Sequence, residues 1–417
     1  PFEKEKIVSS CSAQQIKLTG KNASGVAVQM RKTGQETLIF LLNMDRDHAA
    51  GKVTLSLEED GYPELWDAMS GKIAACVFRK KDGRMEIPLT FAAGEEKLLV
   101  ITAQCRPCPK PEKHIWEKIS CLPEEYEYQL SEENICVLDM VRVTLEDGRG
   151  LPCCEVLKAD RELRDILGIP WRGGEMLQPW YEEKKNGIPA EPLTVIAMEY
   201  RFEAEAVPRE CSLVLEDLEH VTGISLGETE IPLKAEGKWL DTCFDRISLP
   251  SGCIREGVNS LRITYAYYKT CGIEAVYLLG NFGVRLDGGK KKAVLTELPK
   301  RLKAGDITAQ GLPFYSGRIR YFLPDLEKGL YKIRVAGTNA ACVRVIGRED
   351  ALIMQAPYEA VSEDPQAIEL VFGRRNTFGP LHQWPAVDAA YGPGNFVTEG
   401  RAFRDSYVLI KQRSEER

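Results

Sequence analysis

The sequence predicts an all-β protein made of tandem antiparallel β-sandwiches, with a few short helices. Short runs of β-branched, aromatic and aliphatic residues recur about every ten residues, and turns that contain Gly or Asp separate them. The clearest helical periodicity is confined to one segment, Asp160–Leu167. At 417 residues the chain is long enough for several domains, since a domain has roughly 100–200 residues. We therefore expect a series of sandwich domains.

The first hundred residues show this pattern most regularly. Turn signals such as Asp60-Gly61 and Asp82-Gly83 separate the runs. The runs that we expect to be strands are Val26–Arg31, Glu36–Asn43, Lys52–Leu57, Ile73–Arg79, Met85–Phe91 and Lys97–Thr102. A Pro-rich segment, 106–113, follows without apolar periodicity and is expected to be a linker. Residues 1–105 are therefore predicted to form the first sandwich.

Two further sandwiches are expected after the linker. Residues 114–285 contain the helical segment near 160–167, which Asp160 can cap at its start and which Gly168 and Pro170 can end. A faint internal repeat relates strand-like runs of this region to runs between Gly329 and Val371. Residues 286–417 are therefore expected to form a third sandwich of related plan.

Composition excludes some partners. The chain has 55 Lys and Arg against 62 Asp and Glu, a formal net charge of -7, whereas nucleic-acid binding needs basic side chains that neutralise phosphates. No apolar run reaches the ~20 residues needed to cross a bilayer. We therefore expect neither nucleic acid nor membrane as a partner.

The cysteines and the first residues bear on localisation. Thirteen cysteines are an odd number, unlike the even-numbered disulfide frameworks of small secreted proteins. The chain begins at Pro1 with no visible leader, so either a leader was removed or the chain is a piece of a longer protein. We expect reduced thiols and a cytoplasmic location.

Sequence motifs for common catalytic chemistry are not found. There is no phosphate-binding loop, no His-Glu-x-x-His motif and no Gly-x-Ser-x-Gly elbow. Cys105-Arg-Pro-Cys108 would supply half of a four-ligand zinc site, and no second pair has a comparable spacing. We interpret this pair as part of the linker and expect no metal and no cofactor.

One pair of acids lies beside an aromatic pair. Trp180-Tyr181 precedes Glu182 and Glu183. An aromatic platform beside carboxylates suits a sugar ring, and glycoside hydrolysis uses two carboxylates. An exposed turn that leads into the following lysines is the alternative interpretation. Trp180, Glu182 and Glu183 are therefore weaker candidates for a carbohydrate site.

A denser cluster of polar and aromatic residues occupies the segment Gly373–Trp384. Arg375 offers a planar fork of donors, Asn376 offers donors and acceptors, and Trp384 offers an apolar face. His382 adds a donor or acceptor whose state depends on pH. Such a set suits a sugar. It suits equally a buried loop whose polar groups bond to backbone carbonyls at a domain interface.

Several short segments of the sequence share a recognisable pattern. In the last domain they are Gly311–Tyr321, with Tyr315-Ser-Gly at its centre, Gly329–Val335, Ala356-Pro-Tyr358 and Arg375–His382. Together they resemble the galactose-binding-like jelly roll of large bacterial glycoside hydrolases, related to family 2 and to the family 106 α-L-rhamnosidases. Tyr315 belongs to the element that opens the jelly roll in that family. It joins Arg375, Asn376, His382 and Trp384 as a candidate carbohydrate-binding residue.

Other segments extend the resemblance to most of the chain. Val276–Gly283 is similar to the entry into the same jelly roll. Ile39–Asn43, Glu64–Asp67 and Gly94–Val100 resemble the Ig-like sandwich that follows the catalytic barrel. The resemblance therefore implies an Ig-like sandwich over residues 1–105, a jelly-roll sandwich over 114–285 and a galactose-binding-like jelly roll over 286–417.

The resemblance also implies a function. In these enzymes the catalytic residues sit on a (β/α)₈ barrel, and no run of alternating strands and helices here is long enough for one. We therefore expect no catalytic residues in this chain. Its expected role is that of an accessory region of an α-L-rhamnosidase-like glycoside hydrolase, which braces the catalytic barrel of the same parent chain and contributes to carbohydrate recognition.

Two alternatives remain. One is a self-standing carbohydrate-binding protein. The other is a complete hydrolase with an inter-domain active site, in which Glu182 or Glu183 acts as the acid. The full open reading frame separates the accessory region from the self-standing carbohydrate-binding protein, because only an accessory region would follow an encoded barrel.

Overall fold

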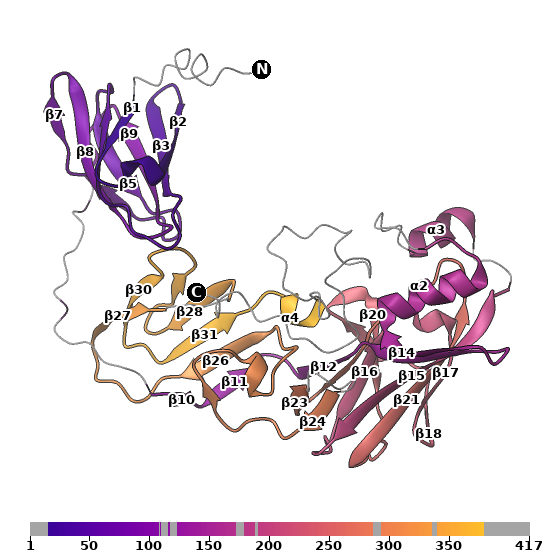
Figure 1. The fold of residues 1–417 in the computed structure, drawn as a ribbon. Coiled ribbons are helices and arrows are strands. Elements are labelled where there is room, and N and C mark those ends of the chain that lie inside the picture. The colour runs from indigo at the N-terminus through magenta and orange to yellow at the C-terminus, as the bar shows by residue number, and fades with distance from the viewer. Residues whose placement is uncertain are drawn as a thin grey trace. The chain divides into compact units, whose positions relative to one another are not determined.

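The computed structural model describes residues 16–107, 109, 116, 123–171, 179–187, 191–286, 293–335 and 340–378 (Figure 1). Over these residues the chain is mostly β-strand, in sheets that are almost entirely antiparallel, with three short α-helices. The prediction of an all-β fold is confirmed. None of the helices in the described residues is both long enough and apolar enough to cross a membrane.

Contacts within the chain divide it into two compact units. The first consists of residues 1–122, 325–336 and 342–366, and the second of residues 123–324, 337–341 and 367–417. The region predicted as one domain over 286–417 contributes to both units. The division into three sandwiches over 1–105, 114–285 and 286–417 stays a prediction.

The first unit contains a sandwich of two antiparallel sheets, with strand orders β1-β4-β8-β7 and β2-β3-β9-β5-β6. Alternation along β3 buries Ile39 and Leu41 completely and leaves Phe40 between them partly exposed. The strands are β1 (Ile16–Thr19), β2 (Val26–Lys32), β3 (Glu36–Asn43), β4 (Gly51–Leu57), β5 (Tyr62–Trp66), β6 (Ile73–Ala75), β7 (Arg79–Lys81), β8 (Arg84–Phe91) and β9 (Glu96–Thr102). The predicted strand Ile73–Arg79 is wrong as one element, because β6 and β7 belong to different sheets.

Later residues add two strand pairs to the first unit. β27 pairs with β30, and β28 pairs with β29. Their bounds are β27 (Leu330–Arg334), β28 (Cys342–Ile346), β29 (Ala351–Ile353) and β30 (Glu359–Glu363).

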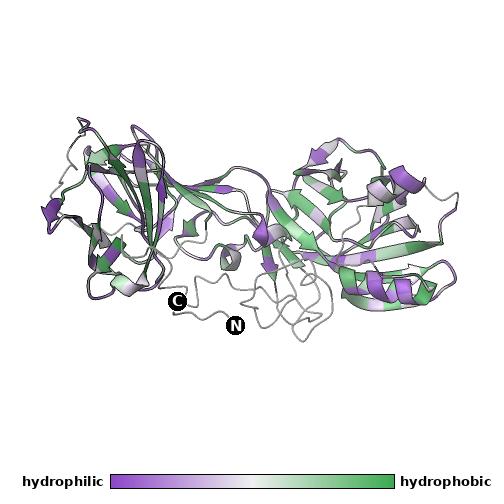
Figure 2. Ribbon diagram, turned by 90° about the horizontal axis from the view of Figure 1, so that it is seen from above, coloured by the Kyte–Doolittle hydropathy of each residue, from purple (hydrophilic) through white to green (hydrophobic). Residues whose placement is uncertain are grey.

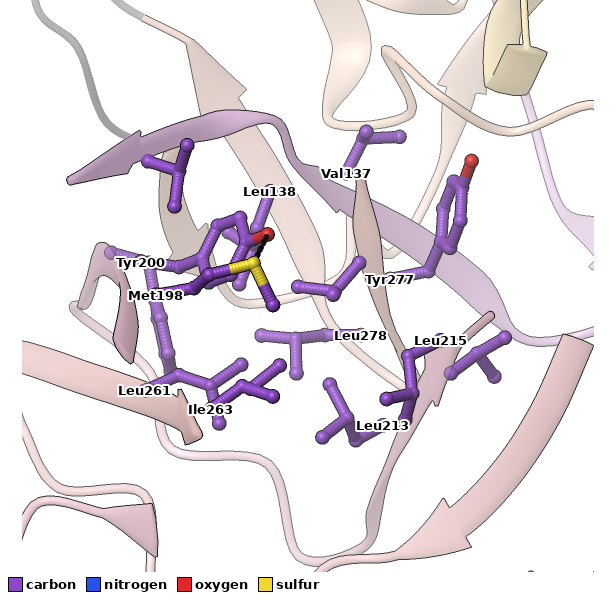
Figure 3. Packing of buried hydrophobic residues seen from close by; sticks show 14 of the residues in the cluster. Val137, Leu138, Met198, Tyr200, Leu213, Leu215, Leu261, Ile263, Tyr277 and Leu278 are labelled. Atoms are coloured by element: carbon purple, nitrogen blue, oxygen red, sulfur yellow. Dashed lines mark hydrogen bonds between the residues drawn. The ribbon is translucent and has the colours of Figure 1, made fainter. Parts of the chain in front are cut away.

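The second unit is built around a larger sandwich. One sheet has the order β12-β22-β16-β20-β19, and the other has the path β14-β13-β15-β21-β17-β18 with β23 and β24 attached. Met198 and Ile263 from one sheet meet Leu213 and Leu278 from the other in the core (Figure 3). The strands are β12 (Asn134–Leu138), β13 (Met140–Leu145), β14 (Gly150–Glu155), β15 (Thr194–Ala204), β16 (Cys211–Leu215), β17 (Val221–Leu226), β18 (Thr229–Ile231), β19 (Gly237–Trp239), β20 (Asp241–Ser248), β21 (Gly257–Tyr267), β22 (Val276–Gly280), β23 (Gly283–Leu286) and β24 (Ala293–Thr296).

A smaller sheet completes the strands of the second unit. β26 (Arg318–Phe322) pairs with both β11 (Tyr128–Leu130) and β31 (Ala367–Val371), and β10 (Glu125–Tyr126) pairs with β25 (Leu302–Lys303). Bands of hydrophobic and hydrophilic residues alternate along many strands of both units (Figure 2), as half-buried strands require.

Helix α2 (Val156–Leu167) starts four residues before the predicted Asp160. Glu155 caps it, because its carboxylate accepts the backbone N–H of Lys158. Its end agrees with the prediction: Gly168 adopts the left-handed conformation, with φ of 65°. The other helices are α3 (Pro179–Asn186) and α4 (Arg375–Phe378), and a 3₁₀ turn lies at Leu218–His220.

Candidate functional site

Within the segment predicted to bind sugar, Arg375–Phe378 form α4, a single helical turn that follows β31 in the second unit (Figure 1). Arg375 and Asn376 lie in this turn. His382 and Trp384 lie outside the described residues, so their part of the predicted site stays a prediction.

Tyr315 lies next to α4, and its side chain forms hydrogen bonds with the backbone. Its side chain is fully buried. The phenol oxygen donates to the carbonyl of Arg318 at 2.8 Å and accepts the backbone N–H of Ser131 at 3.1 Å. Burial raises the pKa of Tyr315, so the phenol stays protonated and can keep donating. This tyrosine therefore joins the start of β26 to the end of β11.

Asn376 and Thr377, the two residues of α4 that follow Arg375, form hydrogen bonds with the segment around Tyr315. The side-chain amide of Asn376 donates to the carbonyl of Tyr315 at 3.0 Å. The Thr377 hydroxyl donates to the carbonyl of Phe314 at 2.7 Å and also contacts the Ser316 hydroxyl. Asn376 and Thr377 are both buried. Such side-chain bonds to carbonyls fix the turn against this segment.

An ion pair holds the residue before α4. The guanidinium of Arg374 binds the carboxylate of Glu132, with 3.0 Å between Nη2 and Oε2. Gly317 lies against the side chains of Glu132 and Tyr315. A Cβ at this glycine would stand 2.7 Å from Glu132 Cγ and 2.5 Å from the Tyr315 hydroxyl oxygen. A side chain at this position would force Glu132 or Tyr315 to move.

Phe378, the last residue of α4, lies in a cluster of aromatic rings. Its ring stacks on Phe244 with centroids 5.5 Å apart, and lies 5.7 Å from Tyr277 and 5.9 Å from Trp239. Burial raises the pKa of the Tyr277 phenol. These rings come from β19, β20 and β22, and in Figure 3 Tyr277 points away from the core that Leu278 enters. The turn is therefore fixed on both sides.

Arg375 is treated differently by the fold. It is exposed, although Arg374 before it is ion-paired and Asn376 after it is buried. The structure thus brings Tyr315 and Asn376 together through one hydrogen bond and presents Arg375 to solvent. The sequence could not separate these roles within one run of polar residues.

The weaker candidates Trp180, Glu182 and Glu183 lie in α3, so a helix stands where an exposed turn was the alternative interpretation. Their side chains lie outside what the structure describes. Tyr181 in the same helix is 48% exposed. A carbohydrate site at α3 therefore stays a prediction.

A small pocket, which we call the corner pocket, lies at one end of the larger sandwich. The β16–β17 connection contributes Glu216 and Asp217, and the β21–β22 connection contributes Glu274. The pocket has about 20 Å³ of room, enough for a single water molecule or one hydroxyl group. Sequence reasoning did not find it, because these acids come from connections far apart in the sequence.

Two tyrosines shape the corner pocket. The Tyr265 hydroxyl donates to the carboxylate of Asp217 at 3.0 Å, and the Tyr200 hydroxyl donates to the carbonyl of Glu274 at 3.0 Å. Burial, followed by the charge of Asp217, holds the pKa of Tyr265 well above its ordinary value. The pocket is therefore an acceptor-rich recess that could receive one hydroxyl of a ligand.

A buried ion pair anchors the β21–β22 connection to helix α2. Asp160 accepts the Tyr267 hydroxyl at 2.8 Å and the backbone N–H of Ile273 at 3.0 Å. Arg164 binds Asp160 at 3.0 Å and donates to the carbonyls of Lys269 and Cys271 at 3.0 and 2.5 Å. Helix α2 thus positions the connection that supplies Glu274 to the pocket.

No family model matches the chain, and no curated protein matches it. The solved structures similar to it include a rhamnosidase from Novosphingobium sp. PP1Y, at 16% identity and a TM-score of 0.23, covering 64% of this chain and 22% of that one. A Ruminococcus gnavus β-glucuronidase is 11% identical, with a TM-score of 0.22 and coverage of 59% and 39%. A β-porphyranase of glycoside hydrolase family 86 from Bacteroides plebeius is 10% identical, with a TM-score of 0.16 and coverage of 63% and 37%. The chain thus covers well under half of the length of each of these glycoside hydrolases.

Proposed function

We propose that the chain is a non-catalytic accessory region of a glycoside hydrolase and that it contacts carbohydrate at Arg375. The observation that best supports the carbohydrate contact is the position of Arg375 on α4. Arg374, Asn376 and Thr377 hold the turn, while the guanidinium between them is exposed. A planar fork of donors on a fixed backbone can bind neighbouring sugar hydroxyls with less ordering of the chain.

The accessory role is supported by the sequence and by the fold. Gly311–Tyr321 and Arg375–His382 resemble the jelly roll of these enzymes. In the structure, the described parts of both segments are joined by the Asn376–Tyr315 and Thr377–Phe314 hydrogen bonds. A motif whose residues serve to hold two segments together suits a scaffold that positions another domain.

The catalytic alternative predicts that the chain hydrolyses glycosides by itself, whereas the accessory role predicts that it does not. We expect the chain by itself to hydrolyse no aryl glycoside, the α-L-rhamnoside included, because its sandwiches resemble only the accessory part of the family. Release of the aryl group is followed by absorbance over a panel of substrates. Turnover that disappears in Glu182→Gln or in Glu183→Gln would contradict the proposal and favour a complete hydrolase.

The carbohydrate contact predicts a loss of affinity in Arg375→Ala. A hydrogen bond to a charged group contributes ~1.5–3 kcal/mol, so the dissociation constant should rise at least about tenfold. Isothermal titration calorimetry with methyl glycosides, including methyl α-L-rhamnopyranoside, measures it. The melting temperature should stay close to that of the wild type, because the side chain is exposed.

Arg209→Ala is the matched control, because it removes another exposed guanidinium of the second unit. It should leave affinity unchanged. An unchanged affinity in Arg375→Ala, or an equal loss in both variants, would contradict a site at α4.

A further inference from the structure

Trp171 stands just after helix α2 in the second unit, and 46% of its surface is exposed. Single exposed apolar side chains are common and usually need no explanation. This one differs in how firmly both its backbone and its ring are held.

The backbone before Trp171 is fixed by the end of the helix. Gly168 turns the chain in the left-handed conformation, and the N–H of Ile169 donates to the carbonyl of Arg164 at 3.0 Å. The guanidinium of Arg164 in turn donates to the carbonyl of Pro170 at 2.9 Å. Since Arg164 belongs to the buried pair with Asp160, the position of Trp171 is tied to the core.

The ring of Trp171 is fixed by two residues one turn apart on α2. Its indole N–H donates to the carboxylate of Asp165 at 2.7 Å. The guanidinium carbon of Arg161 lies 4.0 Å from the ring centroid, a cation–π contact. The ring therefore keeps one orientation while nearly half of the residue stays accessible to solvent.

We propose that Trp171 is a stacking platform for a pyranose ring, with the Asp165 carboxylate at the edge of the indole as a hydrogen-bond acceptor and the Arg161 guanidinium over the other face of the indole. The apolar C–H face of a sugar packs on an aromatic face, and hydroxyls around the sugar ring need donors and acceptors beside it. Asp165 is exposed and Arg161 half-buried. A ring that is already oriented loses little conformational entropy when ligand binds.

This inference rests on the proposed function for the class of ligand, and it adds a binding surface on a different element from α4. A purely structural role for Trp171 makes another forecast. If the indole only covers the end of α2, its removal should lower the melting temperature and leave sugar affinity unchanged.

The test compares Trp171→Ala with Trp116→Ala, which removes an indole that is 40% exposed in the first unit. Binding of methyl α-L-rhamnopyranoside, methyl β-D-glucopyranoside and methyl β-D-galactopyranoside is measured by isothermal titration calorimetry, and folding by circular dichroism. We expect Trp171→Ala to weaken binding about tenfold, which is ~1.4 kcal/mol, at a nearly unchanged melting temperature. Trp116→Ala should bind as the wild type does.

Trp171→Phe keeps the inference testable if the alanine variant folds poorly. It retains an aromatic face but loses the bond to Asp165, so its affinity should lie between those of the wild type and the alanine variant. Wild-type affinity in a folded Trp171→Ala would overturn the platform. So would a change from dimer to monomer in that variant by analytical ultracentrifugation, because the indole would then serve self-association.

The design separates this inference from the proposed function. Loss of affinity in Arg375→Ala alone overturns the platform and leaves the site at α4 standing. Loss in Trp171→Ala alone supports the platform and contradicts the site at α4. A wild-type chain that binds none of the three glycosides contradicts both.

Discussion

Arg164→Ala is expected to lower the free energy of unfolding of the second unit by about 3–5 kcal/mol, because it removes the cation that is paired with a buried carboxylate. The side chains of Arg164 and Asp160 are 3% and 5% exposed. The guanidinium also satisfies the carbonyls of Pro170, Lys269 and Cys271. Urea unfolding followed by circular dichroism measures the change as a shift of the midpoint.

Arg161→Ala is the matched control for this prediction. Arg161 lies one turn earlier on the same helix but is half-buried and contacts the exposed Trp171. A partly exposed charge contributes at most about 1 kcal/mol. Equal destabilisation by the two variants would mean that the buried pair does not anchor α2 and does not fix the backbone before Trp171.

Helix α2 shows where local sequence rules stop. The end of the helix was predictable, because a glycine after the last apolar position is a local signal. The start was not, because Asp160 looks like a cap but is a buried residue that bonds to Tyr267 and Ile273. Those partners are distant in the sequence, and no local pattern announces them.

The strands show the same division. β3, β4, β8 and β9 follow the expected runs closely. In β3 and β8 the alternation of buried and more exposed side chains leaves its period in the sequence, whereas β4 and β9 each end in a continuous buried run. β5 escaped prediction because it contains Pro63, a residue that argues against a strand interior. The run Ile73–Arg79 crosses from one sheet to the other, and an apolar run does not reveal which sheet each residue joins.

For the candidate site, the sequence located the segment but not the role of each residue. A polar cluster at Gly373–Trp384 was visible, yet neighbours in one helical turn point in different directions, so Arg375 and Asn376 differ in burial. Trp171 was not singled out, although Arg161 and Asp165 stand at a spacing that places them on one face of a helix. That spacing, followed by Gly-Ile-Pro-Trp, was the available signal.

Tyr315 has two possible roles, a structural one and a sugar-binding one, and substitutions at this position distinguish them. Its ring is buried in a cluster with Leu312 and Ile319. Its hydroxyl is bonded to Arg318 and Ser131, with none of the side chain exposed. A hydroxyl in this position holds the fold, whereas one that binds sugar must be reachable from solvent.

Tyr315→Ala is therefore expected to destabilise the second unit by about 3–5 kcal/mol, the range for removing a large buried ring. Tyr315→Phe is the control: it keeps the ring, and the N–H of Ser131 still donates to the carbonyl of Arg318 at 3.0 Å. No buried donor is then left unpaired, so the cost should be only about 1 kcal/mol. Thermal and urea unfolding measure both, and calorimetry with the methyl glycosides shows whether Tyr315→Phe keeps its affinity. A stable Tyr315→Ala that has lost sugar binding would contradict the structural role and place the tyrosine in the carbohydrate site.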